Sequence, residues 1–592
     1  MQKDNSNLQK SDQLLTMRHS CEHIMHQAMV ELFPGLKRAM GPATEDGFYL
    51  DFDYDGKVTE EDFPKIEKRM QEIIDSDLPI IREEVSLEKA QEMFADNPYK
   101  LDWVNQIDEK GAKASVYWNG EPGKSDSDVD LCKGPHVTST GKVGPFKLLS
   151  LAGAYWHGDS KNKMLTRLYG TCYPSQKELD EYLHQVEEAK KRDHRKLGKE
   201  LDLFVFSDLV GKGLPLFTPK GTILRDNLNN FSQQLRLDRG FQKVWIPHIT
   251  NKKLYETSGH WAKFGKELFL VTSQETDEQL VMKPMNCPHH QQIYASQIRS
   301  YKDLPIKYLE TTTIYRDEKA GELLGLSRVR SVTQDDSHIF CTPEQIEEVY
   351  TELIQIVKSF YGCLGMTHKA RLSFRDPNES DKYLGERELW KKAQEILLTI
   401  AKENKLDYYI AEGEAAFYGP KIDFMVMDAI GREWQLATPQ LDFVQPQRFG
   451  LSYIDEKGKE QTPVMIHFAL MGSIERFLSV YIEHTAGIFP VWLSPTQAMI
   501  IPIADRHIEF ANNLRSELAK AGIRTDSDNR GESMQSKIRD AQLQKIPYML
   551  VVGDKEVAQR GVSVRTRDNQ NLGLISFEDF KNKVLEDVKS KR

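Results

Sequence analysis

The sequence lacks the features that would place it outside the ordinary globular proteins. Only six cysteines occur in 592 residues, too few and too scattered for a disulfide framework. Apolar runs are short: Ala498–Ala504 is interrupted by Pro502 and falls far below the ~20 residues that span a bilayer. Met1–Ser6 is polar and contains no apolar core of a secretion signal. These absences predict a reduced, cytoplasmic protein without a membrane partner.

Basic residues are also in the minority. The chain has 79 Lys and Arg against 89 Asp and Glu, a formal net charge of -10, which at first sight argues against a nucleic-acid partner. However, Ser494–Arg592 holds 17 basic and 14 acidic residues, and a second basic run lies at Lys190–Lys199. A total summed over several domains says little about one surface. We therefore expect these two segments to contact an RNA backbone.

Length and pattern together predict a multidomain α+β and α/β protein. At ~150 residues per domain, the length corresponds to about four domains. Helices and short strands mix until about Leu493, with a helix predicted at Phe63–Asp75 and strands at Lys243–Pro247 and Lys421–Met427. After Pro495 strands such as Tyr548–Val552 alternate with helices, which is typical of a small α/β domain with a mostly parallel sheet. The capping box Ser175–Glu178 begins a helix that indicates a connector. The predicted parts are a disordered tail at 1–13, an α+β domain at 14–172, a helical linker at 173–200, a mixed domain at 201–493 and an α/β domain at 494–592.

Two histidine-containing pairs could form a site in the first domain. His19 and His23 are four residues apart on a predicted helix and share one face, and Cys132 and His136 repeat this spacing far downstream. Together they suit either a tetrahedral metal set or acid–base groups around a hydrolytic water. An exposed helix with scattered histidines is the alternative, and the spacing does not decide between a metal and no metal.

A second concentration of chemically reactive residues lies between Met282 and His338. It contains Tyr315–Glu318, a loop rich in Gly and Arg, and the polar segment Thr333–His338. Arginines in such a setting suit the bidentate binding of a nucleotide phosphate, and ordinary surface salt bridges are the alternative. Neither GxxxxGK[ST] nor GxGxxG occurs, so the residues alone indicate only an anion-binding enzyme domain.

Three segments, in order, resemble the signature motifs of the class II aminoacyl-tRNA synthetases. Arg239–Pro247 resembles motif 1, Tyr315–His338 resembles motif 2, and Gly472–Phe477 resembles motif 3. Further segments narrow the resemblance to the threonyl-tRNA synthetase family, over about residues 14–592: Met285–Pro288, Thr333–His338, Ala416–Lys421 and Val464–His467. The resemblance implies a homodimer whose subunits have an N-terminal α+β editing domain, a catalytic domain built on an antiparallel sheet flanked by helices, and a C-terminal α/β anticodon-binding domain.

The resemblance also implies one Zn²⁺ per subunit in the synthetic site, held by Cys287, His338 and His467. Three protein ligands leave one position open. In the family, threonine binds this ion through its amino and hydroxyl groups, and Asp336 accepts from the hydroxyl. Valine lacks that oxygen, but serine differs from threonine only by a methyl group worth about 1–3 kcal/mol. A second, hydrolytic site is therefore expected for seryl-tRNA, without an obligatory metal.

Other roles carried over from the family concern ATP and tRNA. Arg316 would hold the α-phosphate of ATP, and Arg328 and Arg476 would neutralise pyrophosphate together with Mg²⁺; Glu318 completes the expected catalytic set. The implied substrate-binding residues are Met285, Gln334, Asp336, Tyr418, Lys421, Gln435 and Ser473. The implied editing residues are His19, His23, Asp130, Cys132 and His136, and the implied anticodon-binding residues are Glu556 and Arg565.

The predicted function is ATP-dependent activation of L-threonine, its transfer to tRNA(Thr), and hydrolysis of mischarged seryl-tRNA(Thr). An RNA-binding regulatory paralogue without synthesis is the alternative, and the retained arginines and metal ligands argue against it. A prolyl or histidyl relative would give no reason for the Cys/His/His trio. Three departures from the family pattern are expected to matter: no leader domain precedes His19, Val332 replaces a phenylalanine that stacks on adenine, and Gly531 replaces a commonly polar anticodon-reading residue.

Overall fold

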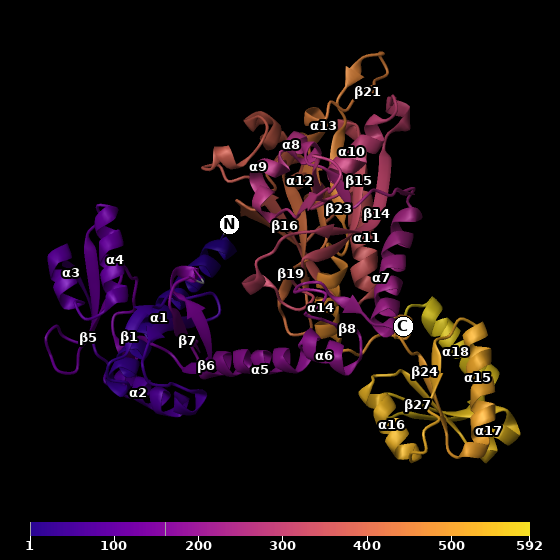
Figure 1. Cartoon of the computed structure of the whole chain (residues 1–592), viewed down its shortest axis with the longest axis horizontal. Coiled ribbons are helices and arrows are strands. Elements are labelled where there is room, and N and C mark those ends of the chain that lie inside the picture. The colour runs from indigo at the N-terminus through magenta and orange to yellow at the C-terminus, as the bar shows by residue number, and fades with distance from the viewer. Residues whose placement is uncertain (1, 160) are drawn as a thin grey trace. The chain divides into compact units, whose positions relative to one another are not determined.

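The computed structural model describes residues 2–159 and 161–592, with side chains from Asp12 onward except at positions 160 and 380. The chain forms two compact units, Met1–Glu187 and Glu188–Arg592 (Figure 1). Helix α1 (Gln2–Leu32) opens the first unit. Because it contains no glycine or proline to break it, it includes residues 2–13, where the sequence predicts a disordered tail. Met1 lies outside the described residues.

Two antiparallel sheets complete the first unit, with the strand orders β1-β2-β7-β6 and β3-β4-β5. Their strands are β1 (Lys37–Met40), β2 (Phe48–Asp53), β3 (Ile80–Val85), β4 (Ala114–Asn119), β5 (Asp128–Leu131), β6 (Phe146–Tyr155) and β7 (Met164–Cys172). Helix α2 (Phe63–Asp75) buries Phe63, Ile66, Met70 and Ile73, the spacing of one helical face. These side chains join apolar residues of α1 and of the larger sheet in one core.

The predicted helical linker consists of α5 (Gln176–Arg192) and α6 (His194–Glu200). Asp193 separates the two helices. Its side chain accepts a hydrogen bond from the backbone N–H of Arg195 and so caps α6.

A nine-stranded sheet forms the centre of the second unit. Its order is β10-β14-β15-β23-β20-β18-β16-β17, with β19 paired to β18. Only two of its pairs are parallel, β10 with β14 and β16 with β17. The strands are β10 (Gln242–Lys243), β14 (Ile306–Tyr315), β15 (Ser331–Cys341), β16 (His368–Phe374), β17 (Tyr408–Glu412), β18 (Lys421–Met427), β19 (Glu433–Gln435), β20 (Thr438–Asp442) and β23 (Val464–Ala469). The sequence-based expectation of an antiparallel sheet therefore holds along most of its width.

Helices pack against this sheet in a single core. They are α7 (Pro219–Leu237), α11 (Ile346–Cys363), α12 (Arg387–Glu403) and α14 (Ile474–Thr485). Helix α11 buries nine of its 18 residues, and Glu348, Gln355 and Ser359 are exposed on the opposite face. A short helix, α10 (Cys287–Ala295), begins at the residue that the sequence singles out as a metal ligand.

The C-terminal domain has a five-stranded sheet with the order β25-β24-β26-β27-β28. Its strands are β24 (Ala498–Pro502), β25 (Thr525–Ser527), β26 (Tyr548–Val552), β27 (Gly561–Thr566) and β28 (Asn571–Ser576). The prediction of a mostly parallel sheet holds only for β25, β24 and β26; β27 and β28 are antiparallel. The connection 553–560 between β26 and β27 is shorter than the dozen or so residues that a parallel crossover needs.

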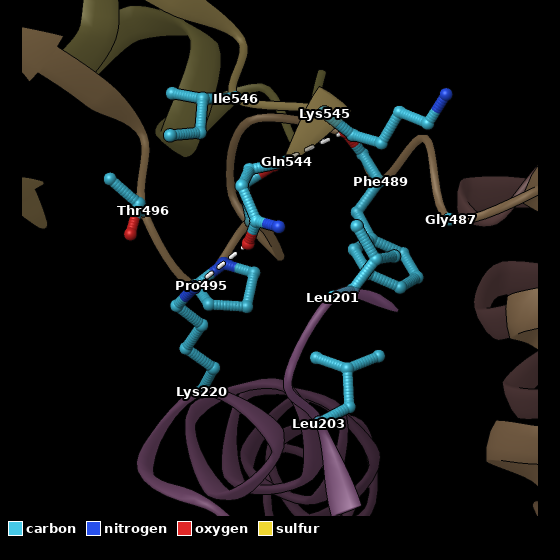
Figure 2. Close-up of a pocket in the computed structure, with 11 residues that line it drawn as sticks. Leu201, Leu203, Lys220, Gly487, Phe489, Pro495, Thr496, Gln544, Lys545 and Ile546 are labelled. Atoms are coloured by element: carbon cyan, nitrogen blue, oxygen red, sulfur yellow. Dashed lines mark hydrogen bonds between the residues drawn. The ribbon is translucent and has the colours of Figure 1, made fainter. Parts of the chain in front are cut away.

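A small cavity of about 30 Å³ lies where α7 meets the C-terminal domain (Figure 2). Lys220 donates from Nζ to Oε1 of Gln544 at 2.9 Å, and Gln544 donates to the backbone oxygen of Glu200 at 2.9 Å. The cavity has room for about one water molecule, which excludes a substrate there. None of the helices in the described part of the chain has the length and apolar character of a membrane span.

Candidate active site and histidine cluster

Most of the residues predicted for the synthetic site line one cleft of about 850 Å³ on the nine-stranded sheet. This volume suits a nucleotide together with a small amino acid. The predicted residues that line it are Met285, Cys287, Arg316, Glu318, Arg328, Gln334, Asp336, His338, Tyr418, Gln435, His467, Ser473 and Arg476. Val332 also lines the cleft. Lys421 instead pairs with Asp423 on its own strand β18.

Strand register brings the predicted metal ligands together. His338 and His467 are direct partners in the antiparallel pair β15–β23, although 129 residues separate them in sequence. Cys287 reaches them from the first turn of α10. The three ligand atoms lie within 4.8 Å of one another, and all three residues are buried. This trio could hold a metal ion.

Neighbouring side chains orient the two imidazoles of the trio. His467 Nε2 lies 2.8 Å from Oδ2 of Asp442, and His338 Nδ1 lies 2.8 Å from Nδ1 of His290. One ring nitrogen of each ligand is thereby left for a metal. Burial lowers the pKa of His338 well below its ordinary value and raises that of the Cys287 thiol well above it. His338 is therefore ready to bind a metal, whereas the Cys287 thiol needs a cation to lose its proton.

Three arginines give the cleft its positive charge. Arg316 follows β14, Arg328 lies in the loop between β14 and β15, and Arg476 lies in the first turn of α14. Burial, together with the charge of Arg328, lowers the pKa of Arg476. The two guanidinium groups therefore repel each other across the cleft. Arg328 Nε donates to Glu318 at 2.9 Å. The N-terminus of α14, capped by Ser473 Oγ, adds its dipole to this field. This concentration of positive charge favours the binding of a polyanion in the cleft.

Several polar side chains in this cleft are not predicted from the sequence. Asn286 donates to Oδ2 of Asp336 at 3.0 Å, and the hydroxyl of Tyr418 donates to the side-chain oxygen of Gln440. His260 also lines the cleft, and burial, with smaller contributions from nearby cationic groups, lowers its pKa to about 3. Only strand pairing could have found Gln440, which is the register partner of His467.

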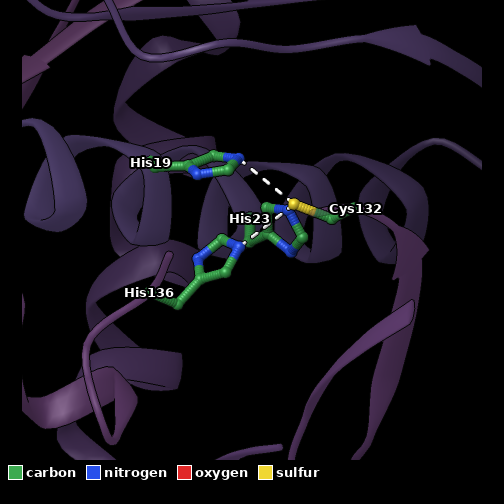
Figure 3. A group of neighbouring side chains, drawn as sticks. All are labelled: His19, His23, Cys132 and His136. Atoms are coloured by element: carbon green, nitrogen blue, oxygen red, sulfur yellow. Dashed lines mark hydrogen bonds between the residues drawn. The ribbon is translucent and has the colours of Figure 1, made fainter. Parts of the chain in front are cut away.

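The predicted histidine and cysteine pairs also meet, in the first unit. His19 and His23 project from α1, while Cys132 and His136 lie on the segment after β5, and Figure 3 shows the four side chains turned toward one another. Cys132 Sγ lies 3.3 Å from His19 Nε2 and 3.2 Å from His136 Nε2. The intervening turn requires Gly134, whose φ is +73° and where a Cβ would come within 2.2 Å of the Tyr117 hydroxyl.

Burial keeps this cluster uncharged. It lowers the pKa of His23 well below its ordinary value and, with the neighbouring His19, lowers that of His136 to about 3. It raises the pKa of the Cys132 thiol to about 12. The four ligand atoms lie within 4.8 Å of one another. Neutral imidazoles in this geometry can either bind a metal or accept a proton from water.

Asp130 stands beside this group rather than in it. Its Oδ2 lies 2.8 Å from Nδ1 of His26, and its Oδ1 lies 2.7 Å from Nζ of Lys100. Burial alone would raise the pKa of Asp130, but Lys100, Arg38 and His26 lower it well below its ordinary value. No motif or spacing points to Lys100, which reaches this site from helix α4 (Pro98–Glu109).

The two predicted anticodon-binding residues differ in their surroundings. Both carboxylate oxygens of Glu556 are engaged within the domain, one by the backbone N–H of Gly553 at 2.9 Å and the other by Ser563 Oγ at 2.6 Å. Arg565 is exposed on β27, and Gly531 is exposed in the loop before helix α16 (Met534–Leu543). Arg565 is thus exposed to solvent, whereas the carboxylate of Glu556 stabilises a turn of its own domain.

Comparisons with known proteins agree with this geometry. Residues 269–485 match the tRNA synthetase class II core domain (G, H, P, S and T), 497–587 match an anticodon binding domain, and 115–169 match the threonyl and alanyl tRNA synthetase second additional domain. The chain is 47% identical over 582 residues to the threonine–tRNA ligase of Rubrobacter xylanophilus, which covers 98% of this chain and 90% of that relative. The chain belongs to the threonine–tRNA ligase family.

Further relatives support this membership. The threonine–tRNA ligase of Deinococcus radiodurans is 48% identical over 586 residues, 97% of this chain and 89% of the relative. A crystal structure described as the RNA binding domain of threonyl-tRNA synthetase from Cryptosporidium parvum is 37% identical, with a TM-score of 0.64, and the match covers 67% of this chain and 98% of that one. The predicted family, the class II catalytic fold and the presence of an editing-type domain are confirmed.

Proposed function

We propose that this chain activates L-threonine with ATP, transfers it to tRNA(Thr), and hydrolyses seryl-tRNA(Thr) formed by error. The ligase reaction follows from membership of the family, and one observation carries its chemistry. The Cys287, His338 and His467 trio and the three arginines line the same cleft. An amino-acid subsite and a phosphate subsite therefore lie within one volume. A regulatory paralogue that had lost synthesis would have no use for both.

The trio fits Zn²⁺. One thiolate and two neutral imidazoles are ligands that this ion prefers, and three protein ligands leave a position open for substrate. When bound there, Zn²⁺ would supply a Lewis-acid contact to the amino and hydroxyl groups of threonine. Asp336, held by Asn286, would accept a hydrogen bond from the threonine hydroxyl. Valine has no hydroxyl to donate to this carboxylate, which would disfavour its binding relative to threonine.

The arginines would carry the phosphate chemistry. Arg316 would bind the α-phosphate of ATP, while Arg328 and Arg476 would bind the leaving pyrophosphate, and Mg²⁺ would enter with ATP. Charge that develops on the phosphate oxygens would meet guanidiniums already fixed in place, the arrangement that lowers a barrier most effectively. Glu318 supports this role because it orients Arg328 through its carboxylate.

The second cluster would hydrolyse the seryl ester. His19, His23 and His136 are neutral at pH 7 because burial lowers the pKa of each, so one of them can accept the proton of the attacking water. Cys132, protonated at this pH, would donate or position rather than attack. The buried ion pair between Asp130 and Lys100 would hold the side chains beside this site in place. In this proposal the hydrolysis would use these groups without an obligatory metal.

The segment resembling motif 1 supports a homodimer. Trp245 lies in this segment and is 76% exposed in the single chain. Exposed tryptophan is costly in water and is enriched in protein interfaces. A second copy that covers Trp245 would bury this ring.

Threonine-dependent exchange between ATP and pyrophosphate, combined with metal analysis, tests the proposal. The purified chain should exchange with threonine, not with valine, and should contain one zinc per subunit. Cys287→Ser should lose both the zinc and the exchange, whereas Cys363→Ser, at the end of α11 and outside the cleft, should retain both. Absence of exchange by the zinc-loaded wild type would favour the regulatory paralogue. Full zinc content in Cys287→Ser would refute the metal assignment.

A further inference from the structure

His194 connects three parts of the second unit that lie far apart in sequence. It is the first residue of α6 and is 3% exposed. Its Nδ1 lies 2.7 Å from Oε1 of Glu483, near the end of α14, and its Nε2 lies 3.1 Å from the backbone nitrogen of Leu326. Leu326 belongs to the loop that carries Arg328. One imidazole thus joins the linker, the arginine loop and the helix that carries Arg476.

These two contacts define the tautomer of His194. The backbone N–H of Leu326 can only donate, so Nε2 of His194 accepts and carries no proton. Nδ1 then holds the proton and donates it to Glu483. Burial alone would raise the pKa of Glu483, but the hydrogen bonds from His194 and Arg432 outweigh it and lower the pKa. Glu483 is therefore an ionised acceptor that fixes the ring.

The same residues do not form a metal site. Asp193, His194 and Glu483 place their ligand atoms within 4.8 Å of one another, but each is already engaged within the chain. Both oxygens of Asp193 bind Arg195, and the second oxygen of Glu483 accepts from Arg432 at 2.5 Å. Both ring nitrogens of His194 are also in use, so a cation could bind only by displacing hydrogen bonds that these residues already make.

The arginine loop is shaped to accept this imidazole. Gly325 has a φ of +48°, and a Cβ at this position would lie 2.2 Å from Nε2 of His194. Leu326 is fully buried, and the next residue, Ser327, donates from Oγ to Ser479 Oγ of α14 at 3.0 Å. The loop is therefore attached at two adjacent residues, immediately before Arg328.

We infer that His194 is a positioning residue for ATP: it holds the Leu326 backbone so that Arg328 faces Arg476 across the cleft. This inference rests on the proposed function, because it assigns Arg328 to the phosphates of ATP. Arg328 is half-exposed and is held otherwise by Glu318 and Glu322 of its own loop. Those contacts orient the side chain within the loop, and His194 fixes the loop itself to the rest of the domain.

The test compares three substitutions of His194 by threonine-dependent ATP–pyrophosphate exchange. Gln can place its amide oxygen near the position of Nε2 and accept from Leu326, whereas Asn can reach only Glu483. His194→Ala and His194→Asn should each lower kcat/KM for ATP about tenfold to a hundredfold, the range that a misplacement near 1 Å produces. His194→Gln should recover most of this loss. The KM for threonine should stay within about twofold in all three, because the metal trio and Asp336 are untouched.

Two controls keep the outcome interpretable. His184→Ala removes an exposed histidine of α5 and should leave exchange unchanged. Hydrolysis of seryl-tRNA reports on the first unit and should also be unchanged in every variant. Equal losses for the Asn and Gln variants, or a parallel rise in the KM for threonine, would show a merely structural role and overturn the inference. A wild type without exchange would instead refute the proposed function.

Discussion

Asp442 fixes the orientation of His467 through a 2.8 Å contact between Oδ2 and Nε2. Its other oxygen accepts hydrogen bonds from the backbone N–H groups of Val444 and Gln445, at 2.8 and 2.9 Å. The carboxylate is fully buried and cannot turn without losing these bonds. Asp442 is thus a rigid support for one ligand of the metal trio.

Asp442→Asn should weaken zinc binding by about 10- to 100-fold, the usual effect of changing the hydrogen-bond partner of a ligand histidine. The amide is nearly isosteric but can present a donor instead of an acceptor to His467. Competition with a chromophoric chelator measures the affinity directly, and Asp208→Asn, at an exposed loop position, is the control. Equal zinc retention by the two variants would contradict the supporting role of Asp442.

Local sequence patterns predicted many single elements well. Phe63–Asp75, Lys421–Met427 and Tyr548–Val552 occur as α2, β18 and β26 with the predicted bounds. In each, apolar spacing or β-branched content within one short stretch determines the element. The predicted strand Lys243–Pro247 is reduced to β10, because only Gln242 and Lys243 pair with β14. The length of a strand at a sheet edge depends on the strand with which it pairs, and that partner lies elsewhere in the sequence.

Spacing and residue type predict the functional sites less completely than the single elements. Spacing suggested the pairing of His19 with His23, because one helix carries both. The metal trio was identified only through family resemblance, since its proximity depends on the register of β15 and β23. Glu556 shows the opposite case: it matches a base-reading position, but its carboxylate is engaged at a turn. Neither burial nor hydrogen-bond partners of a single side chain can be read from its neighbours in sequence.

Changing His23 and Cys132 together to Ala should prevent the hydrolysis of mischarged tRNA, so that this product accumulates. Both side chains belong to the cluster in Figure 3, and the double change removes its thiol and its most strongly buried neutral imidazole. Seryl-tRNA(Thr) should accumulate in charging reactions that contain serine, while the rate of threonine charging should be unchanged. His157→Ala, exposed in the same unit, is the matched control. Clearance of seryl-tRNA at the normal rate by the double variant would exclude this cluster as the editing site.

Arg236→Met should destabilise the second unit by about 3–5 kcal/mol, the cost of leaving a buried charge without its partner. Arg236 and Asp335 are both fully buried; Arg236 donates to the backbone oxygen of Asp335 at 2.7 Å and to Ser337 Oγ at 2.8 Å. Asp335 also accepts from the backbone of Met471, so the network joins α7, β15 and the segment before α14. Urea denaturation should show the loss, and Arg239→Met, at a partly exposed position in the turn that follows α7, should show little. Similar midpoints for the two variants would contradict this ranking.

His136 should make the first unit less stable as the pH falls. Burial and the nearby His19 lower its pKa to about 3, whereas in the unfolded chain a histidine titrates near 6.5. Between these two values the unfolded state binds the extra proton and is favoured, so stability falls on acidification and is fully restored above about pH 6.5. One such group contributes at most about 1.4 kcal/mol per pH unit.

The pH series should be recorded by calorimetry on the full chain from pH 7.5 to 5.5, with a chelator present so that no metal competes for the imidazole. His136→Gln removes the titrating ring and should reduce the fall in Tm of the first unit, while lowering its Tm at pH 7.5 only through lost packing. His184→Ala, which removes an exposed histidine, should keep the wild-type slope. If wild type and His136→Gln lose stability in parallel, His136 is protonated in the folded chain as readily as in the unfolded one, and its neutral state in this cluster is excluded.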